Sequence, residues 1–185
     1  GENATDFPKV PSVSNDFTAE ISSDVLARAV NNTIFATSND ELRPAMTGVY
    51  VNLGDKNTTF VATDGHRLVR YRRTDVKSDN GNAIIIPRKA LNLLKATLPA
   101  ENTDVVVNFN MANAFFRFGN IRMICRLIDE RFPDYENVIP SGNNIKMTIG
   151  RNELLVEQGP HDGRSEGGHS GPGKPHGSES YFRRR

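Results

Sequence analysis

Two stretches with the periodicity of an amphipathic helix limit most strongly what this chain can fold into. The first spans about residues 23–36 and the second about residues 88–98, and each is preceded by one strand-like run and followed by several more. The apolar positions that define the two helices are Leu26, Val30, Ile34, Leu91, Leu94 and Leu98. This repeated pattern predicts an α+β domain of two strand–helix–strand halves, with two helices packed on antiparallel sheet.

The expected strands are short runs rich in β-branched and aromatic residues, separated by turns that contain Asn, Asp, Gly or Pro. They span residues 16–21, 47–53, 58–63, 66–73, 83–86, 105–109, 114–118 and 121–128. Together with the two helices, these strands complete the duplicated pattern.

One turn in this series has an unusual composition. Asp64-Gly65 joins two strand-like runs and is a strong hairpin signal, because both residues tolerate positive φ. Backbone requirements do not explain why Thr63, His66 and Arg67 surround that pair. A hydrolase using Asp64 and His66 is one alternative, but a nucleophile or metal site would need more histidines or carboxylates at ligand-like spacing. The other three histidines belong to a Gly-rich C-terminal segment, so we expect no catalytic residue, metal or cofactor.

Three short motifs occur in a fixed order along the chain. They are Thr-Asp-Gly-His-Arg-Leu at 63–68, Ile-Pro-Arg-Lys at 86–89 and Arg-Phe-Pro-Asp-Tyr at 131–135. Together they resemble the middle domain of the bacterial DNA polymerase III β sliding clamp, over about residues 1–155. The resemblance implies the DNA-clamp fold and a non-catalytic processivity factor of DNA replication, an accessory subunit of a DNA-directed DNA polymerase holoenzyme.

Short similarities about 125 residues apart suggest tandem domains. Residues 7–11 resemble 132–140, and residues 17–26 resemble 145–155. The expected divisions are 1–15 as the end of a preceding clamp domain, 16–142 as a complete middle domain, 143–155 as the start of a following domain, and 156–185 as a disordered tail. We therefore expect the chain to be a fragment.

The tail prediction follows from composition. Beyond residue 156 the chain is rich in Gly, Pro, Ser and His and has almost no apolar residues before Tyr181-Phe182, so it cannot bury enough surface to offset its ordering entropy. Its histidines, His161, His169 and His176, are too widely spaced for a recognisable metal site.

Charge and cysteine content narrow the functional classes. With 23 Lys and Arg against 22 Asp and Glu, the chain is not a general polyanion binder, and any DNA contact must come from a local basic face. A single cysteine, Cys125, excludes an intramolecular disulfide framework and favours a reducing compartment. No signal-peptide pattern or long apolar run is present, so we expect a cytoplasmic protein.

The resemblance also implies two sets of binding residues. Because helices line the DNA hole in that family, the expected DNA-facing residues are Arg28, Arg43, Arg88, Lys89 and Lys95. The pocket for short linear peptides of the replicative polymerase and clamp loader is expected to include Met46, Thr63, Gly65, His66, Arg67, Leu68, Pro133, Asn137 and Val138. Asn137 departs from the basic residue that some relatives have there, and the rest of the pocket comes from the following domain.

The same resemblance sets expectations for assembly. The parent protein is expected to be a ring-shaped homodimer around duplex DNA, whereas this fragment, which lacks the outer domains that close the ring, is expected to be monomeric. A stand-alone nucleic-acid-binding module, aided by residues 183–185, is the remaining alternative.

Overall fold

The computed structural model describes residue 3 and residues 17–78, 81–157 and 178–182. The chain divides into two compact units, one formed by Gly1–Pro133 with Gly177–Arg185 and the other by Asp134–His176. Apart from residue 3, the expected remnant of a preceding domain at 1–15 lies outside the described residues, as does most of the predicted tail.

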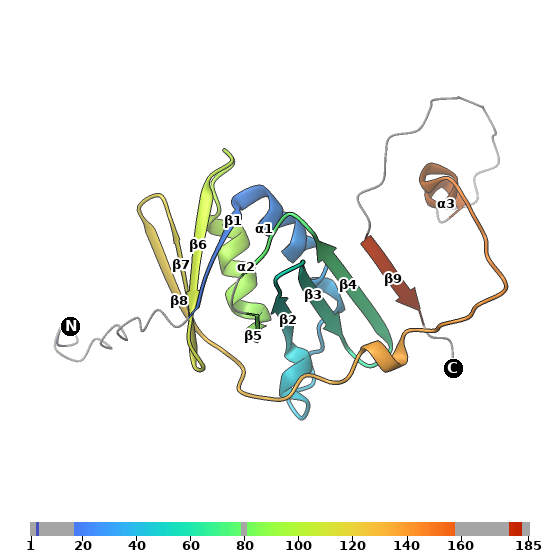
Figure 1. Ribbon diagram of the computed structural model, residues 1–185, viewed down its shortest axis with the longest axis horizontal. Coiled ribbons are helices and arrows are strands. Elements are labelled where there is room, and N and C mark those ends of the chain that lie inside the picture. Colours follow the sequence, from blue (N-terminus) through green and yellow to red (C-terminus); the bar gives the residue numbers. More distant parts are fainter. Residues whose placement is uncertain (1–2, 4–16, 79–80, 158–177, 183–185) are drawn as a thin grey trace. The chain divides into compact units, whose positions relative to one another are not determined.

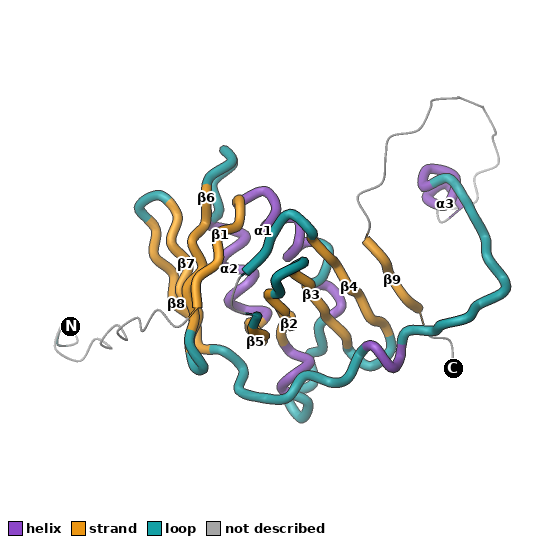
Figure 2. Tube along the Cα trace, in the orientation of Figure 1, coloured by secondary structure: helices purple, strands orange, loops and turns teal. Residues whose placement is uncertain are grey.

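Two antiparallel sheets form the framework of the first unit (Figures 1 and 2). The four-stranded sheet has the order β1-β6-β7-β8, with bounds Phe17–Ser22, Asp104–Phe109, Asn113–Phe118 and Ile121–Arg126. The five-stranded sheet has the order β5-β2-β3-β4-β9, with bounds Asn82–Pro87, Gly48–Leu53, Thr58–Thr63, Arg67–Arg73 and Ser178–Phe182. The predicted strands are therefore present, and β9 is an additional one.

Helices α1 (Ser23–Asn31) and α2 (Arg88–Thr97) lie between the two sheets (Figure 1). The predicted first helix is longer than α1, because the chain changes after Asn31 to a short 3-10 helix at Ile34–Ala36. Thr33 lies at this change, and its hydroxyl donates to the carbonyl oxygen of Ala29 at 2.7 Å. Such local side-chain bonds compete with continued α-helix.

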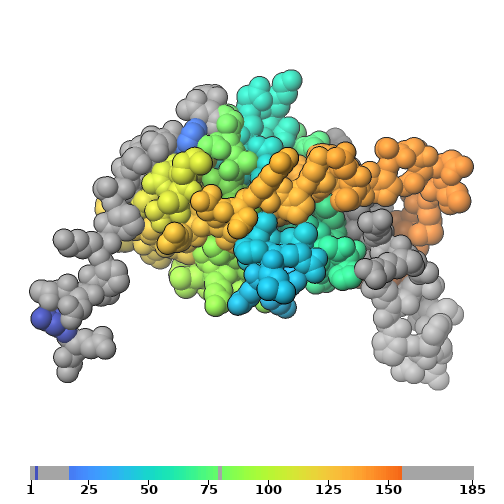
Figure 3. Space-filling view, turned by 90° about the horizontal axis from the view of Figure 1, so that it is seen from below, coloured from blue at the N-terminus to red at the C-terminus, as the bar shows by residue number. Residues whose placement is uncertain are grey.

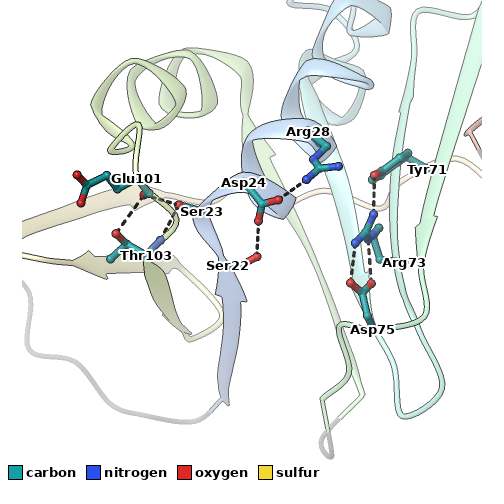
Figure 4. Close-up of polar contacts among 9 residues, drawn as sticks. All are labelled: Ser22, Ser23, Asp24, Arg28, Tyr71, Arg73, Asp75, Glu101 and Thr103. Carbon is teal, nitrogen blue, oxygen red and sulfur yellow. Dashed lines mark hydrogen bonds and ion pairs between the residues drawn. The ribbon is translucent and has the colours of Figure 1, made fainter. Parts of the chain in front are cut away.

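Polar contacts fix the start of α1 (Figure 4). The N–H of Ser23 donates to the carbonyl of Thr103 at 2.8 Å, and the Ser23 hydroxyl accepts from the N–H of Thr103 at 3.0 Å. These bonds connect α1 to the segment that leads into β6, so the two halves of the duplicated pattern are joined at their helix and strand ends.

A single apolar core extends through both sheets and both helices. The predicted helix positions Leu26, Val30, Leu91 and Leu94 are all buried, with Leu94 fully inaccessible. Phe109 and Phe116 from the four-stranded sheet and Val49 and Leu53 from the five-stranded sheet complete this core. The prediction of an α+β domain with two helices packed on antiparallel sheet is confirmed, although the sheet is divided into two.

The two sheets adjoin where β5 meets the residues after β8. The N–H of Ile128 donates to the carbonyl of Ile85 at 3.0 Å. Gly48, at the start of β2, lies at the same place, because a Cβ there would be 2.6 Å from the Ile86 oxygen and 3.0 Å from Cδ1 of Ile128. Only glycine leaves enough room for this approach.

The second unit contains little regular structure in its described part. A 3-10 helix covers Glu136–Val138, an extended segment follows, and helix α3 covers Arg151–Glu157. In the extended segment Ile145 and Met147 are 90% and 78% exposed. Because residues 145–155 resemble residues 17–26, the sequence predicts a strand followed by a helix here. The structure has the helix, α3, but no paired strand precedes it in residues 141–150.

The tail differs in part from the sequence prediction. The predicted disorder at residues 158–177 and 183–185 lies outside the described residues. Ser178–Phe182, however, forms β9 and pairs with β4. Pairing with a distant strand supplies the hydrogen-bond partners that this segment lacks locally.

Candidate functional site

The turn between β3 and β4 is held by Thr63. This side chain is buried, donates from its hydroxyl to the carbonyl of Arg67 at 2.8 Å, and accepts from the N–H of Gly65 at 3.1 Å. Gly65 has a φ of +88°, a conformation that favours glycine. These two hydrogen bonds explain why a threonine precedes Asp-Gly, which the general requirements of a hairpin turn do not explain.

Asp64 completes the turn. Its Oδ1 accepts from the N–H groups of His66 (2.9 Å) and Arg67 (3.0 Å), and its Oδ2 accepts from Nε of Arg67 at 2.9 Å. Partial burial raises the pKa of Asp64, but the backbone donors of Arg67 and His66 together with the Arg67 guanidinium outweigh burial and lower that pKa below its usual 3.8. A carboxylate held in this way shapes a turn and is poorly suited to act as a general base.

Two further side chains lie against this turn. The Arg67 guanidinium is 5.9 Å from the centroid of the Phe35 ring, a cation–π distance, and Phe35 is 54% exposed. A Cβ on Gly65 would be 3.3 Å from Nη1 of Arg43, whose Nε also pairs with Asp40 at 3.0 Å. Phe35 is not among the site residues predicted from sequence, and Arg43 is predicted there to face DNA. The signal for Phe35 in the sequence is that it is an aromatic residue outside the apolar stripe of the first predicted helix.

We define the turn cluster as the exposed or half-exposed group Phe35, Arg43, Asp64, Gly65, His66 and Arg67. It combines the imidazole of His66 and the guanidinium of Arg67, on the hairpin end, with the aromatic face of Phe35 and the guanidinium of Arg43 from two neighbouring segments. The loop that contributes Arg43 forms part of the surface seen in Figure 3, coloured blue to cyan. Such a cluster can contact an apolar side chain and hydrogen-bond acceptors of an extended peptide.

The other predicted partner-site residues have different positions. Leu68 is buried in β4, and half-buried Met46 is connected to Arg43 by a 3.0 Å bond from its N–H to the Arg43 carbonyl. Pro133 is half-buried and follows Phe132, whose ring stacks on Tyr50 at 4.8 Å. Asn137 and Val138 belong to the second unit, where the Asn137 amide donates to Asp134 and Val138 is 53% exposed.

The predicted DNA-facing residues are distributed over α1, α2 and the loop after α1. Arg28 on α1 is exposed and paired with Asp24 (Figure 4), while Lys89 and Lys95 on α2 are exposed. Among the described residues, neither lysine takes part in an ion pair.

A groove of about 390 Å³ lies between the start of α2 and the loop before β2. Its lining residues are Ser38, Asn39, Glu41, Thr47, Pro87, Arg88, Lys89 and Asn92. Arg88 donates to the side-chain oxygen of Asn39 across this groove, so its guanidinium is already engaged. The groove therefore has a mixed polar lining, with Lys89 as its accessible cation.

Neither a metal centre nor a membrane span is found in the described part of the chain. No group of three or more His, Cys, Asp or Glu side chains there could hold a metal ion. Over the same residues, no helix has the length and apolar character to cross a bilayer. The three tail histidines lie outside the described residues.

The duplicated α+β architecture and the hairpin cluster at its surface define a clamp-type domain. The chain belongs to the DNA polymerase III beta subunit family, and the sequence model of that family's central domain matches residues 20–134. This result confirms the family resemblance inferred from the three motifs.

Individual relatives agree with this assignment. The beta sliding clamp of Staphylococcus epidermidis strain RP62A is 35% identical over 155 residues, covering 83% of this chain and 41% of the relative. The beta sliding clamp of Staphylococcus aureus strain N315 is 34% identical over the same shares of each chain. The chain therefore spans about two-fifths of the length of these relatives.

Solved structures show the same fold. The sliding clamp of Bacillus subtilis superimposes with a TM-score of 0.72 at 28% identity, over 76% of this chain and 37% of that one. The DNA polymerase III beta subunit of Pseudomonas aeruginosa gives a TM-score of 0.73 at 28% identity, over 77% and 39%. A sliding clamp from Bartonella birtlesii bound to griselimycin gives 0.68 at 32% identity, over 76% and 39%.

Proposed function

We propose that the protein to which this chain belongs is a replication processivity factor, a sliding clamp subunit that encircles duplex DNA and tethers the replicative polymerase. The observation that supports this most directly is the match of residues 20–134 to the central domain of the DNA polymerase III beta subunit. Tethering requires binding surfaces and no bond-making step. We propose a non-catalytic role, consistent with the use of Asp64 to build a turn.

We further propose that the turn cluster is this domain's share of a peptide pocket for polymerase and clamp-loader segments. Three features support this. The hairpin end is rigid because Thr63 and Asp64 bond its backbone, and Phe35 offers an apolar face. His66 and Arg67 are exposed beside that face. Arg43 and Met46 extend the site along the neighbouring loop, so the pocket includes Arg43 in addition to the residues expected from sequence.

A labelled peptide from a polymerase C-terminus with a clamp-binding motif is expected to bind the purified chain saturably. The variants His66→Ala and Arg67→Ala should each weaken binding about tenfold, or about 1.4 kcal/mol, because exposed contact groups are lost from a preformed site. Fluorescence anisotropy measures the affinities. Pro133→Ala tests the segment that follows Phe132.

Arg122→Ala is the matched control for the binding experiment, because Arg122 is an exposed strand arginine on β8 in the other sheet. Its affinity should equal that of the unchanged chain. If His66→Ala, Arg67→Ala and Arg122→Ala all bind as tightly as the unchanged chain, the turn cluster is not the peptide site.

We propose that α1 and α2 present the DNA-facing surface, with Lys89 and Lys95 as the main phosphate contacts and Arg28 and Arg88 as secondary ones. The two lysines are exposed on α2, whereas Arg28 is paired with Asp24 and Arg88 with Asn39. Phosphate contacts of this type position a protein without reading sequence, as sliding requires.

The isolated chain is expected to bind duplex DNA only weakly, with a Kd above ~10⁻⁴ M at physiological salt, because an open domain cannot encircle the duplex. At low salt, where binding is measurable, Lys89→Ala/Lys95→Ala should reduce the slope of log K against log salt by about two. Lys56→Ala/Lys77→Ala, which removes two exposed loop lysines, is the control. A micromolar Kd with a steep salt slope would instead favour a stand-alone nucleic-acid-binding module.

We also propose the assembly and location expected from the family resemblance. The parent protein forms a ring-shaped homodimer in the bacterial cytoplasm, and this chain provides a complete middle domain at 16–142 with the start of the next domain at 143–155. The exposed apolar residues Ile145 and Met147 are consistent with a strand whose partner belongs to that following domain.

A further inference from the structure

The four-stranded sheet has one face packed against the helices and one face turned away from them (Figure 1). The strand register assigns residues to these faces, because residues directly opposite each other share a face. Phe116 of β7, opposite Val107 of β6 and Met123 of β8, marks the face that packs into the core. The alternate residues of β7 and β8 form the other face. Three of them are exposed arginines, which we name the arginine face: Arg117, Arg122 and Arg126.

The arginine face has a defined spacing. Arg117 is directly opposite Arg122 across β7 and β8, so their Cβ atoms are about 4.5–5.5 Å apart. Arg126 lies further along β8, about 13 Å from Arg122 at the usual rise per residue of a strand. Half-buried Ile124 lies between these two arginines and is opposite Phe115 on β7. Along β8, two guanidinium groups are thus separated by one apolar side chain.

The charges of the arginine face are not balanced within the described part of the chain. None of its three members takes part in an ion pair there. The carboxylates on the same side of the sheet, Glu20 and Asp104, belong to β1 and β6, and Val106 separates Glu20 from Arg117. Arg117 and Arg122 are like charges directly opposite each other, an arrangement that destabilises a sheet. A negatively charged partner would relieve this repulsion.

We propose that the arginine face binds an acidic peptide in an extended conformation, with two carboxylates flanking one apolar side chain. Side chains on one face of an extended peptide recur at every second residue, with the same spacing as Arg122, Ile124 and Arg126 on β8. Each guanidinium can form two parallel hydrogen bonds to one carboxylate. The turn cluster is built around the β3–β4 turn of the other sheet, so this proposal does not depend on the function proposed above.

Single-stranded nucleic acid is the other class of anionic partner. Proteins that bind it place aromatic side chains where bases can stack on them. Phe115 is the one aromatic residue on this face of the four described strands, and it is only 7% exposed. The face therefore offers no stacking surface, which favours an acidic peptide.

Fluorescence anisotropy with the full chain at low salt tests the proposal. The probe is the labelled peptide Gly-Glu-Ser-Leu-Ser-Glu-Gly, and the control probe has Gln in place of both Glu residues. The acidic probe should bind saturably and at least about tenfold more tightly than the control probe, because both carboxylate contacts require charge. Equal affinities for the two probes, or no saturable binding of either, would overturn the proposal.

Variants of the chain test the location of the site. Arg122→Gln and Arg126→Gln should each weaken binding of the acidic probe at least about fivefold, because each removes one guanidinium–carboxylate contact. Arg72→Gln, which removes an exposed arginine of β4 in the other sheet, is the matched control and should bind like the unchanged chain. Equal affinities in all three variants would overturn the proposal, whether all are weakened or none is.

Labelled oligothymidylate is titrated in parallel with the acidic probe. It should bind no more tightly than the acidic probe, because the arginine face has no exposed aromatic ring for its bases. If the oligonucleotide binds in an Arg122-dependent way and the acidic probe does not bind, the partner is a nucleic acid and the proposal is wrong.

Discussion

Gly48→Ala is expected to lower the free energy of unfolding by about 2–3 kcal/mol. A Cβ at this position would be 2.6 Å from the backbone oxygen of Ile86, 2.9 Å from Cγ2 of Ile85 and 3.0 Å from Cδ1 of Ile128. The nearest neighbour is backbone within a paired strand, which cannot move aside without disturbing β5. The new methyl group must therefore separate the two sheets where they adjoin.

Urea unfolding followed by circular dichroism measures this effect. Gly81→Ala is the matched control, because the nearest atom to its new Cβ is the Leu53 oxygen at 3.6 Å, an ordinary contact distance. The control should lie within about 0.5 kcal/mol of the unchanged chain, as is usual for surface substitutions. If Gly48→Ala is as stable as Gly81→Ala, the close approach of the two sheets is not required for the fold.

The fold was largely predictable because the relevant patterns are local. The helix stripe that contains Leu91 and Leu94 and the strand run 58–63 each depend on neighbours within a few residues, and both elements occur as expected. The division of the sheet was not predictable in the same way. It depends on Gly48, Ile85 and Ile128, which are far apart in sequence, and nothing local marks their approach.

Strand β9 is a clearer example of an element that local sequence patterns do not predict. Composition alone predicts that a Gly-, Pro- and Ser-rich tail remains disordered, since it has no core of its own. The five residues that form a strand do so against β4, more than a hundred residues earlier in the chain. Tyr181-Phe182 was the only local sign, and an isolated aromatic pair does not specify a partner.

Only the residues of the candidate site that lie within one motif could be predicted from the sequence. The requirements of a hairpin turn account for Asp64 and Gly65. The Thr-Asp-Gly-His-Arg-Leu motif identified Thr63, His66 and Arg67 as further candidate site residues. The contact of Phe35 with Arg67 and the position of Arg43 close to Gly65 bring three separate segments together, so no single motif contains them. Their assignment to the turn cluster therefore had to come from the structure.

Asp64→Ala is expected to have the second large effect, because the Asp64 carboxylate accepts three hydrogen bonds within the turn. Its removal leaves the N–H groups of His66 and Arg67 without their acceptor and frees the Arg67 guanidinium. The free energy of unfolding should fall by about 1–3 kcal/mol. Peptide affinity should fall about tenfold or more, since His66 and Arg67 would no longer be held in one conformation. Asp55→Ala, in the exposed turn between β2 and β3, is the matched control for both measurements.

The pH dependence of the free energy of unfolding distinguishes the effect of the Asp64 charge from the effect of removing its side-chain atoms. Because the pKa of Asp64 in the folded chain is lowered below 3.8, its charged form stabilises the fold above about pH 4, and that stabilisation is lost as the pH falls through the folded pKa. The stability difference between the unchanged chain and Asp64→Ala should therefore be constant from pH 5 to 7 and narrow below about pH 4. Urea unfolding between pH 3 and 7 measures this difference. A difference that stays the same down to pH 3 would mean that the ionised carboxylate does not hold the turn. His66 and Arg67 would then be positioned by Thr63 and Gly65 alone.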